Sequence, residues 1–203
     1  MKKIVFVLTF AVAVLCQQSA SAQSFGDLFK SLGSLLGGAA TQTVVEKPVY
    51  PTEKELVGTW IYTEPQIVYE GSDALASVAI SAVKSQVPAL AQKFGVVAGR
   101  DYAIVKGSKA TAYSAGKKAK VTYTYIPSTG KAIITGEHNG KKIIVTGYAT
   151  IKDGAVTLLF DANELIALLK ETTTYKENST LQMMASVIQS YPGIKVGATA
   201  QKK

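Results

Sequence analysis

The sequence predicts a mainly β protein: an eight-stranded antiparallel up-and-down barrel with helical insertions. Residues 101–160 alternate between apolar and polar side chains and are rich in Val, Ile, Thr and Tyr, as half-buried strands are. Asn139-Gly140 and Asp153-Gly154 interrupt this region, and both dipeptides favour two-residue hairpin turns. One further strand-like segment precedes the region and one follows it, and closure into a barrel would remove the exposed edges of such a sheet.

The first strand is expected within residues 55–63. Alternation places Gly58, Trp60 and Tyr62 on one face there, which a strand buried on one side requires. Proline removes a backbone donor, so Pro65 is expected to end the strand.

A helix is expected between the first two strands, over residues 72–94, because a continuous apolar stripe runs along it at helical spacing and Gly95 follows as a stop. Two more helices are expected before the last strand at 194–201, beginning at the capping residues Asp161 and Ser179. The six strands of the central meander are expected at 102–106, 109–114, 120–126, 131–137, 142–152 and 155–160.

Residues 1–22 have the pattern of a secretory signal peptide. A basic start precedes an apolar run from Ile4, and Ala20-Ser21-Ala22 supplies an A-x-A cleavage signal. The mature protein is therefore expected in the periplasm or outside the cell. The alternative, a lipoprotein anchored through Cys16, is less favoured because Leu15 rather than a small residue precedes the cysteine.

Residues 23–52 are expected to form a short amphipathic helix followed by a linker, ahead of the barrel domain at 53–203. Apolar residues from Phe25 to Leu36 fall on one helical stripe. A helix this short is marginal alone in water, so the stripe is expected to dock on its own domain, on a membrane surface at the cell envelope or on a partner protein.

Composition excludes several functions. One Cys and one His exclude a disulfide framework and a multi-histidine metal site, so no metal and no cofactor are expected. The net charge is +8, but among 22 basic residues only Arg100 is an arginine, and nucleic-acid sites depend on arginine. The dispersed lysines are read as solvated hairpin ends that keep strand edges from pairing, and no nucleic-acid partner is expected.

The sequence offers little that could carry catalysis. His138 is the one imidazole and lies in an expected hairpin turn. No Gly-x-Ser-x-Gly nucleophile motif is present, and the few acidic residues of the strand region fall at strand ends. We therefore do not expect an enzyme.

The aromatic residues are the best candidates for a binding site. A tyrosine combines apolar area with a hydroxyl, which suits a pocket for an amphipathic ligand. The alternative is that these rings only fill the core or cover the outer wall. The candidate ligand-binding residues are Trp60, Tyr62, Tyr123, Tyr125 and Tyr148.

Gly58-Thr59-Trp60 on the first strand of an eight-stranded meander, with a helix before the closing strand, resembles the lipocalin superfamily. More closely, residues 53–203 resemble a family of secreted lipocalin-like proteins of Gram-negative bacteria known only as a domain of unknown function. The resemblance implies the fold, with Gly58 and Trp60 as its structural motif, and more loosely ligand binding. Lipocalins pack a late arginine over this tryptophan; this chain has none there, and Lys195 or Lys202 is the expected substitute. The other segments that carry the resemblance are the helix with Pro88, then Phe94-Gly95-Val96, Leu158-Leu159-Phe160-Asp161-Ala162 and residues 191–197.

Two functions follow as alternatives. In the first, the barrel holds a small hydrophobic or amphipathic ligand. In the second, the barrel is solid and serves as a non-enzymatic envelope scaffold that docks through Phe25 to Leu36. Small interior residues such as Gly58, Gly147 and Ala149 would favour a cavity, and bulky ones a scaffold.

Overall fold

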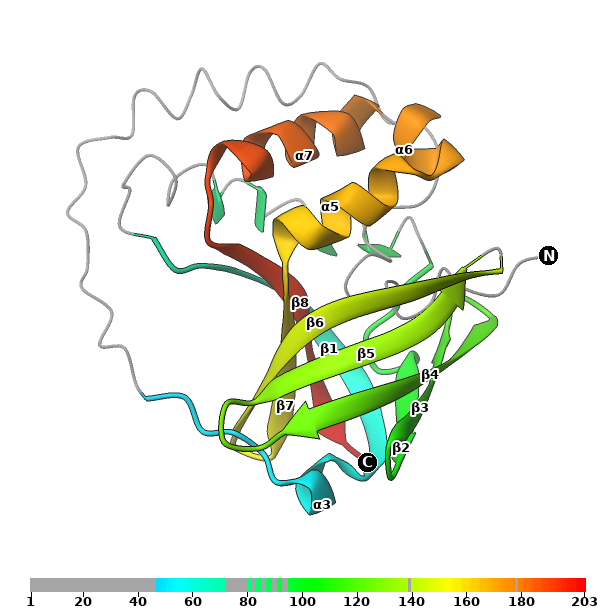
Figure 1. Ribbon diagram of the computed structural model, residues 1–203, viewed down its shortest axis with the longest axis vertical. Helices are drawn as coiled ribbons and strands as arrows, with labels where there is room; N and C mark the ends of the chain where they lie inside the picture. The colour runs from blue at the N-terminus through cyan, green and yellow to red at the C-terminus, as the bar shows by residue number, and fades with distance from the viewer. Residues whose placement is uncertain are drawn as a thin grey trace.

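Eight strands close into an antiparallel barrel in which each strand pairs with its neighbour in sequence and β8 pairs with β1 (Figure 1). This computed structural model describes residues 47–71, 80–81, 83–84, 87–88, 91–92, 95–138, 140–177 and 179–203. The closed up-and-down topology confirms the predicted fold class. The expected signal peptide at 1–22, with Cys16, and the amphipathic segment from Phe25 to Leu36 lie outside the described residues.

The strands largely follow the turn signals in the sequence. Asp153 and Gly154 both adopt positive φ, +51° and +76°, as the tight hairpin between β6 and β7 requires. The strands are β1 (Gly58–Tyr69), β2 (Tyr102–Lys106), β3 (Lys109–Ser114), β4 (Lys117–Ile126), β5 (Lys131–His138), β6 (Lys141–Lys152), β7 (Ala155–Asp161) and β8 (Ile194–Lys202).

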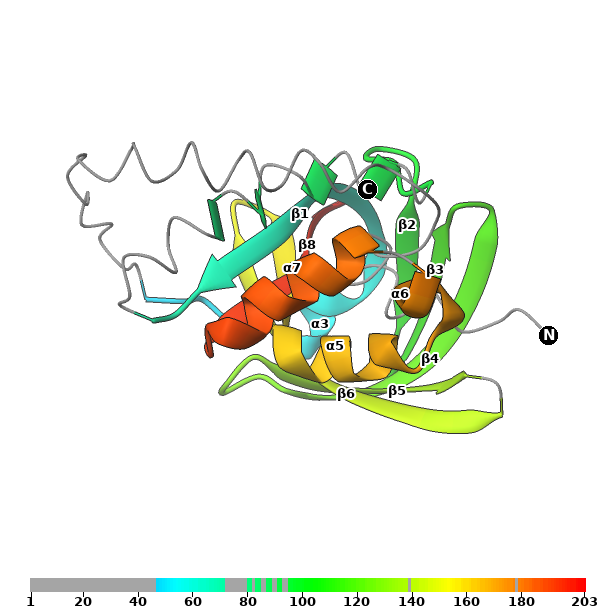
Figure 2. The same cartoon turned by 90° about the horizontal axis from the view of Figure 1, so that it is seen from above.

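Helices cover one end of the barrel (Figure 2). They are α5 (Ala162–Lys170), α6 (Thr173–Glu177) and α7 (Ser179–Ser190), and the short α6 was not predicted. The buried side chains Leu165 and Leu169 of α5 pack into the barrel core, whereas Ile166 joins a second core shared with α7 and β8. The described residues at 80–81, 83–84, 87–88 and 91–92 are helical, in agreement with the predicted insertion, and no helix of the described chain is long and apolar enough to cross a membrane.

The opposite end of the barrel is closed by residues 47–56, where the sequence suggested a linker and the start of a strand. Residues Glu53–Leu56 form a helical turn, α3, capped by Thr52. The Glu55 backbone N–H donates to Thr52 Oγ1 at 3.3 Å, and the Thr52 N–H donates to a Glu55 carboxylate oxygen at 2.7 Å. This reciprocal capping box holds the segment in a turn before Gly58, which corrects the expected strand start at residue 55.

Strand β1 does not end at Pro65, which corrects another expectation. The register with β8 shifts between Tyr62 and Glu64, and the strand then continues to Tyr69 opposite Ile194. The pairing with β2 ends at Ile61, so Pro65 lies where the strand has a partner on one side only. A proline is tolerated there because no ladder bond is required of its nitrogen on the open side.

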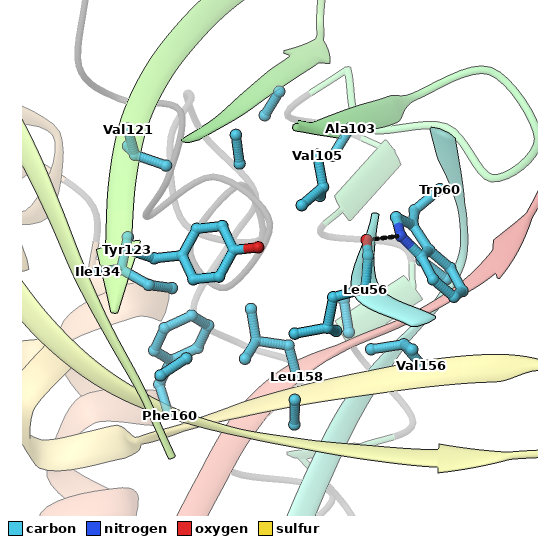
Figure 3. Close-up of a pocket in the computed structure, with 16 residues that line it drawn as sticks. Leu56, Trp60, Ala103, Val105, Val121, Tyr123, Ile134, Val156, Leu158 and Phe160 are labelled. Carbon is cyan, nitrogen blue, oxygen red and sulfur yellow. Dashed lines mark hydrogen bonds between the residues drawn. The ribbon is translucent and has the colours of Figure 1, made fainter. Parts of the chain in front are cut away.

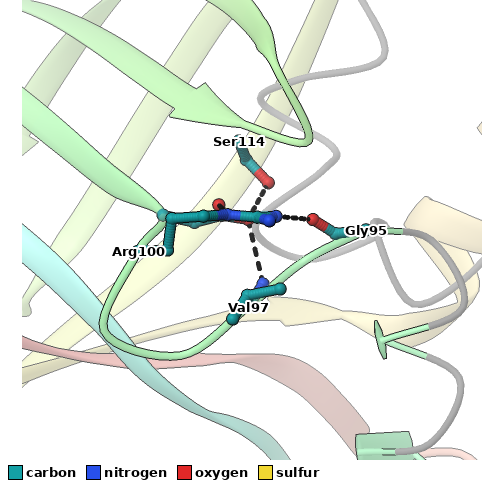
Figure 4. A network of polar contacts seen from close by, with 5 residues as sticks. Gly95, Val97, Arg100 and Ser114 are labelled. Carbon is teal, nitrogen blue, oxygen red and sulfur yellow. Dashed lines mark hydrogen bonds and ion pairs between the residues drawn. The ribbon is translucent and has the colours of Figure 1, made fainter.

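A buried carboxylate fastens the helical insertion to the sheet (Figure 4). Asp101 is 2% exposed and precedes β2. It accepts hydrogen bonds from the Val97 N–H at 3.1 Å, from Arg100 Nε at 3.1 Å and from the Ser114 hydroxyl on β3. Three donors from a loop and a neighbouring strand therefore converge on one charge, which fixes where the insertion joins the barrel.

Candidate functional site

The barrel encloses an apolar cavity of about 170 Å³ (Figure 3). The strands contribute most of its wall, and Leu56 at the end of α3 contributes from below the barrel. The interior is therefore not filled by its own side chains, which favours the first of the two expected functions. The wall consists of Leu56, Trp60, Ala103, Val105, Ala110, Ala112, Val121, Tyr123, Ala132, Ile134, Ala149, Val156, Leu158, Phe160, Ala198 and Ala200.

Alanines account for the empty space. Seven of the sixteen wall residues are alanines, and they recur at every second position, as Ala110 with Ala112 on β3 and Ala198 with Ala200 on β8. Of the three small residues singled out from the sequence, Ala149 lines the cavity. A Cβ at Gly147 would lie 3.0 Å from side-chain atoms of Leu158, so that position is already filled by its neighbours.

Trp60 lies on the cavity wall, and two polar contacts fix its indole ring: a hydrogen bond from the indole nitrogen and a lysine over the ring. Its Nε1–H donates to the Leu56 carbonyl oxygen at 2.7 Å, which ties β1 to α3. The Lys202 ammonium lies 5.3 Å from the centre of the ring and reaches the Glu55 carbonyl oxygen at 3.1 Å. Of the two lysines expected to substitute for the missing arginine, Lys202 is therefore the one that lies over the tryptophan.

Tyr123 points its hydroxyl into the cavity (Figure 3). No group in the described part of the chain forms a hydrogen bond with this hydroxyl, and burial, followed by the charge of Glu53, raises the pKa of Tyr123. The hydroxyl is thus a neutral donor at physiological pH, held in an otherwise apolar space. A ligand with one acceptor atom could satisfy it.

Tyr62 and Tyr125 are buried but do not form part of the cavity wall. Tyr62 is 4% exposed and packs with Ala91, Val96 and Ala198, where the helical insertion meets the barrel. Tyr125 donates its hydroxyl hydrogen to the Pro51 carbonyl oxygen at 2.7 Å. Both rings hold covering segments against the barrel, and burial raises the pKa of each to about 12.

Tyr148 lies on the outer wall, which differs from the prediction that it lines the interior. Its neighbours Gly147 and Ala149 are buried, so alternation along β6 turns the Tyr148 side chain outward. There the Lys195 ammonium lies 4.7 Å from the centre of its ring. The structure therefore brings two of the five candidate residues, Trp60 and Tyr123, to the cavity.

The candidate residues were chosen for their aromatic side chains, so most of the residues on the cavity wall were not predicted. The signal that could have found them is the alternation of alanine with polar residues in Lys109–Ser114 and Ile194–Lys202. Within the described residues, no group of three or more His, Cys, Asp and Glu side chains is placed to hold a metal ion.

Residues 32–202 match a family described as Lipocalin-like domain (DUF4923), which covers the barrel and the segment before it. Neither the curated proteins nor the solved structures contain a significant match.

Proposed function

We propose a binding function for this chain, which belongs to the lipocalin-like domain family (DUF4923): the barrel holds a small hydrophobic or amphipathic molecule. The observation that carries the proposal is the cavity of about 170 Å³ with its apolar wall. Apolar cavities of similar size, about 150 Å³, remain dry and take up ligands such as benzene. Burial of an apolar group in such a space gains about 25 cal/mol for each Å² removed from water.

The chemistry of the wall supports binding rather than catalysis. Tyr123 is the one residue with a titratable side chain among the sixteen that form the wall, and its raised pKa keeps it protonated near neutral pH. A general acid or base works best with a pKa close to the operating pH. A single neutral hydroxyl in an apolar space instead suits orientation of a ligand by one hydrogen bond.

Filling the cavity tests the proposal. Ala132 lies on the wall and is 6% exposed, so Ala132→Leu places three additional carbons in the space. The affinity for decanol, measured by its effect on the fluorescence of the one tryptophan, Trp60, is expected to fall at least about tenfold.

Ala155→Leu is the matched control, because Ala155 lies on β7 in the outward-facing alternation and makes no part of the wall. Its affinity for decanol should equal that of the unmodified protein. Equal loss in both variants, or no change in fluorescence with any alkanol, would contradict binding in the barrel.

We also propose that residues 1–22 direct export, on the evidence of the leader pattern ending in Ala20-Ser21-Ala22. Expression of the full chain in a Gram-negative host, followed by fractionation and N-terminal sequencing, tests this. Cleavage after Ala22 with recovery from the periplasm or medium is the expected result. Retention of the intact chain in the cytoplasm would contradict it.

A further inference from the structure

The barrel wall is incompletely paired between β4 and β5. Their ladder runs from Ile126 opposite Lys131 to Thr122 opposite Thr135 and stops there. Beyond this point, the remaining residues of β4 pair only with β3, and the end of β5 pairs only with β6. Figure 2 shows the β5–β6 hairpin diverging from β4 on this side of the molecule.

A groove of about 840 Å³ occupies the place where the strands separate, and residues from β2 to β6 form its walls. Ala110 and Val121 border both this groove and the interior cavity. Opposite Val121 stands Gly136, and a Cβ there would lie 3.3 Å from Val121 Cγ1. One valine side chain packed against a glycine thus marks the boundary between the outer groove and the barrel interior.

The outer groove is basic. Four exposed lysines, Lys106, Lys109, Lys120 and Lys142, line it with one carboxylate, Glu137, which is paired in register with Lys142. None of the four lysines forms an ion pair with a described residue. The groove therefore has an excess of positive charge that the described protein does not neutralise.

Two of these lysines face each other directly. Lys106 on β2 is in register with Lys109 on β3, and like charges at opposite positions of an antiparallel pair destabilise it. A bound anion would offset this repulsion. The lysine pair is therefore a more specific indication of an anionic ligand than the net charge of the whole chain.

The size of the cavity limits how much of a ligand it encloses. Pockets that bind complete small molecules commonly have volumes of about 300–1,000 Å³, whereas the volume of this cavity is about 170 Å³. An apolar tail fits this space better than a whole ligand. The rest of the molecule would then extend past Val121 into the groove.

We propose that the protein binds single-chain anionic amphiphiles, with the tail in the barrel cavity and the anionic head in the lysine-lined groove between β4 and β5. This rests on the proposed function, because it requires the cavity to hold the tail. It adds the charge class of the ligand and the side of the barrel through which the ligand extends.

Three probes with the same ten-carbon alkyl group separate the two proposals: decanoate, decanol and decylammonium. The two ions are used below their micelle concentrations and decanol below its solubility limit, and binding is detected through Trp60 fluorescence. Decanoate is expected to bind about threefold to tenfold more tightly than decanol, and decylammonium more weakly than both. Added salt should reduce the preference for decanoate because it screens the exposed lysines.

Charge variants locate the head. Lys106→Gln/Lys109→Gln should remove most of the preference for decanoate and leave decanol binding unchanged; it also removes the unfavourable lysine pair, so the fold should persist. Lys84→Gln/Lys176→Gln removes the same charge from exposed helical positions and should keep the preference. Glu137→Gln should increase decanoate affinity because it removes the one negative charge of the groove. A gain in affinity cannot result from misfolding, so this variant separates an effect of charge from loss of the fold.

Equal binding of decanoate and decanol, or equal loss in the groove and control variants, would overturn the groove proposal and leave the cavity proposal intact. No binding of any of the three probes would overturn both.

Discussion

At the scale of single residues, Tyr123 and Tyr125 show how one side-chain type serves two purposes on one strand. Both belong to β4, two positions apart, and both face inward. The Tyr125 hydroxyl is bonded to the Pro51 carbonyl oxygen at 2.7 Å, whereas the Tyr123 hydroxyl has no partner within the described structure. The first is therefore assigned to stability and the second to ligand recognition.

Replacement of each tyrosine by phenylalanine tests this division. Tyr125→Phe should lower the free energy of unfolding by about 1–2 kcal/mol, since it leaves a buried carbonyl without its donor. Tyr123→Phe should leave stability unchanged or slightly higher, and should weaken binding of decanol, whose oxygen can accept a hydrogen bond from Tyr123, more than binding of decanoate, whose head lies in the groove. Urea unfolding of both variants gives the comparison, and a larger stability loss in Tyr123→Phe would contradict the assignment.

Stability is expected to fall in alkaline solution through Tyr62 and Tyr125. Burial, followed by nearby carboxylates, raises the pKa of each from 10.0 to about 12 in the folded protein. The unfolded chain therefore loses these protons first, and the stabilisation, complete below pH 10, is lost as the pH rises through about 12. Between about pH 9 and about pH 11, Tyr62→Phe/Tyr125→Phe should lose less unfolding free energy than the unmodified protein. An identical loss would contradict the contribution of these two tyrosines.

The sequence predicted two of the aromatic residues on the cavity wall, Trp60 and Tyr123, but not the alanines that leave its space empty. Alternation correctly placed Trp60 and Tyr62 on the buried face of β1 and Tyr123 with Tyr125 on that of β4. It could not decide which face of β6 points inward, so Tyr148 was assigned to the interior although it stacks under Lys195 outside. A strand with apolar residues on both faces carries no such signal.

At the scale of elements, the barrel depends on two contacts that join non-regular segments to the sheet. Residues 47–56 close one end: the Ile151 N–H donates to the Val49 carbonyl oxygen at 2.8 Å, and Pro51 accepts from Tyr125. At the other side of the fold, Asp101 accepts hydrogen bonds from Val97, Arg100 and Ser114. The contacts of Val49 and Pro51 join residues far apart in the sequence, so a local pattern could not predict them.

The Asp101 carboxylate should contribute more to the free energy of unfolding than its ion pair with Arg100 does. Asp101→Asn removes the buried charge that accepts three hydrogen bonds, and should lower the free energy of unfolding by about 2 kcal/mol. Arg100→Gln is the matched control, because the Arg100 side chain is 57% exposed, so solvent screens its ion pair with the buried Asp101 and its removal should cost at most about 1 kcal/mol. Thermal unfolding of the two variants decides the order, and an equal effect would show that the carboxylate is not the centre of the contact.

Element boundaries were predicted well where turn chemistry is local and poorly where it is not. Asp153-Gly154 gave the β6–β7 hairpin from two residues. Pro65 was read as the end of β1, but the strand continues because only β8 pairs with it there. The capping box of Thr52 and Glu55 is also a local signal, but residues from 55 onward were predicted as a strand, so the α3 turn was not predicted.

At the scale of the whole molecule, the proposed function depends on two features: the closed barrel and the alanines on its inner wall. Closure pairs every strand with two neighbours along part of its length, and open stretches remain between β4 and β5 and beside the second half of β1. Alanines at alternate positions leave space that larger side chains would fill, at a cost in packing contacts. The sequence predicted the closed barrel from strand number and turns, but an internal volume depends on how all eight strands pack at once.

The most direct test of ligand binding inside the barrel is the position of a ligand methyl group. Nuclear Overhauser contacts between the terminal methyl of isotope-labelled decanoate and the protein would locate it. Contacts are expected to the methyl groups of Ile134 and Val156 on the cavity wall. Contacts confined to Met184 and Ile188 of α7, or to no interior side chain, would contradict it.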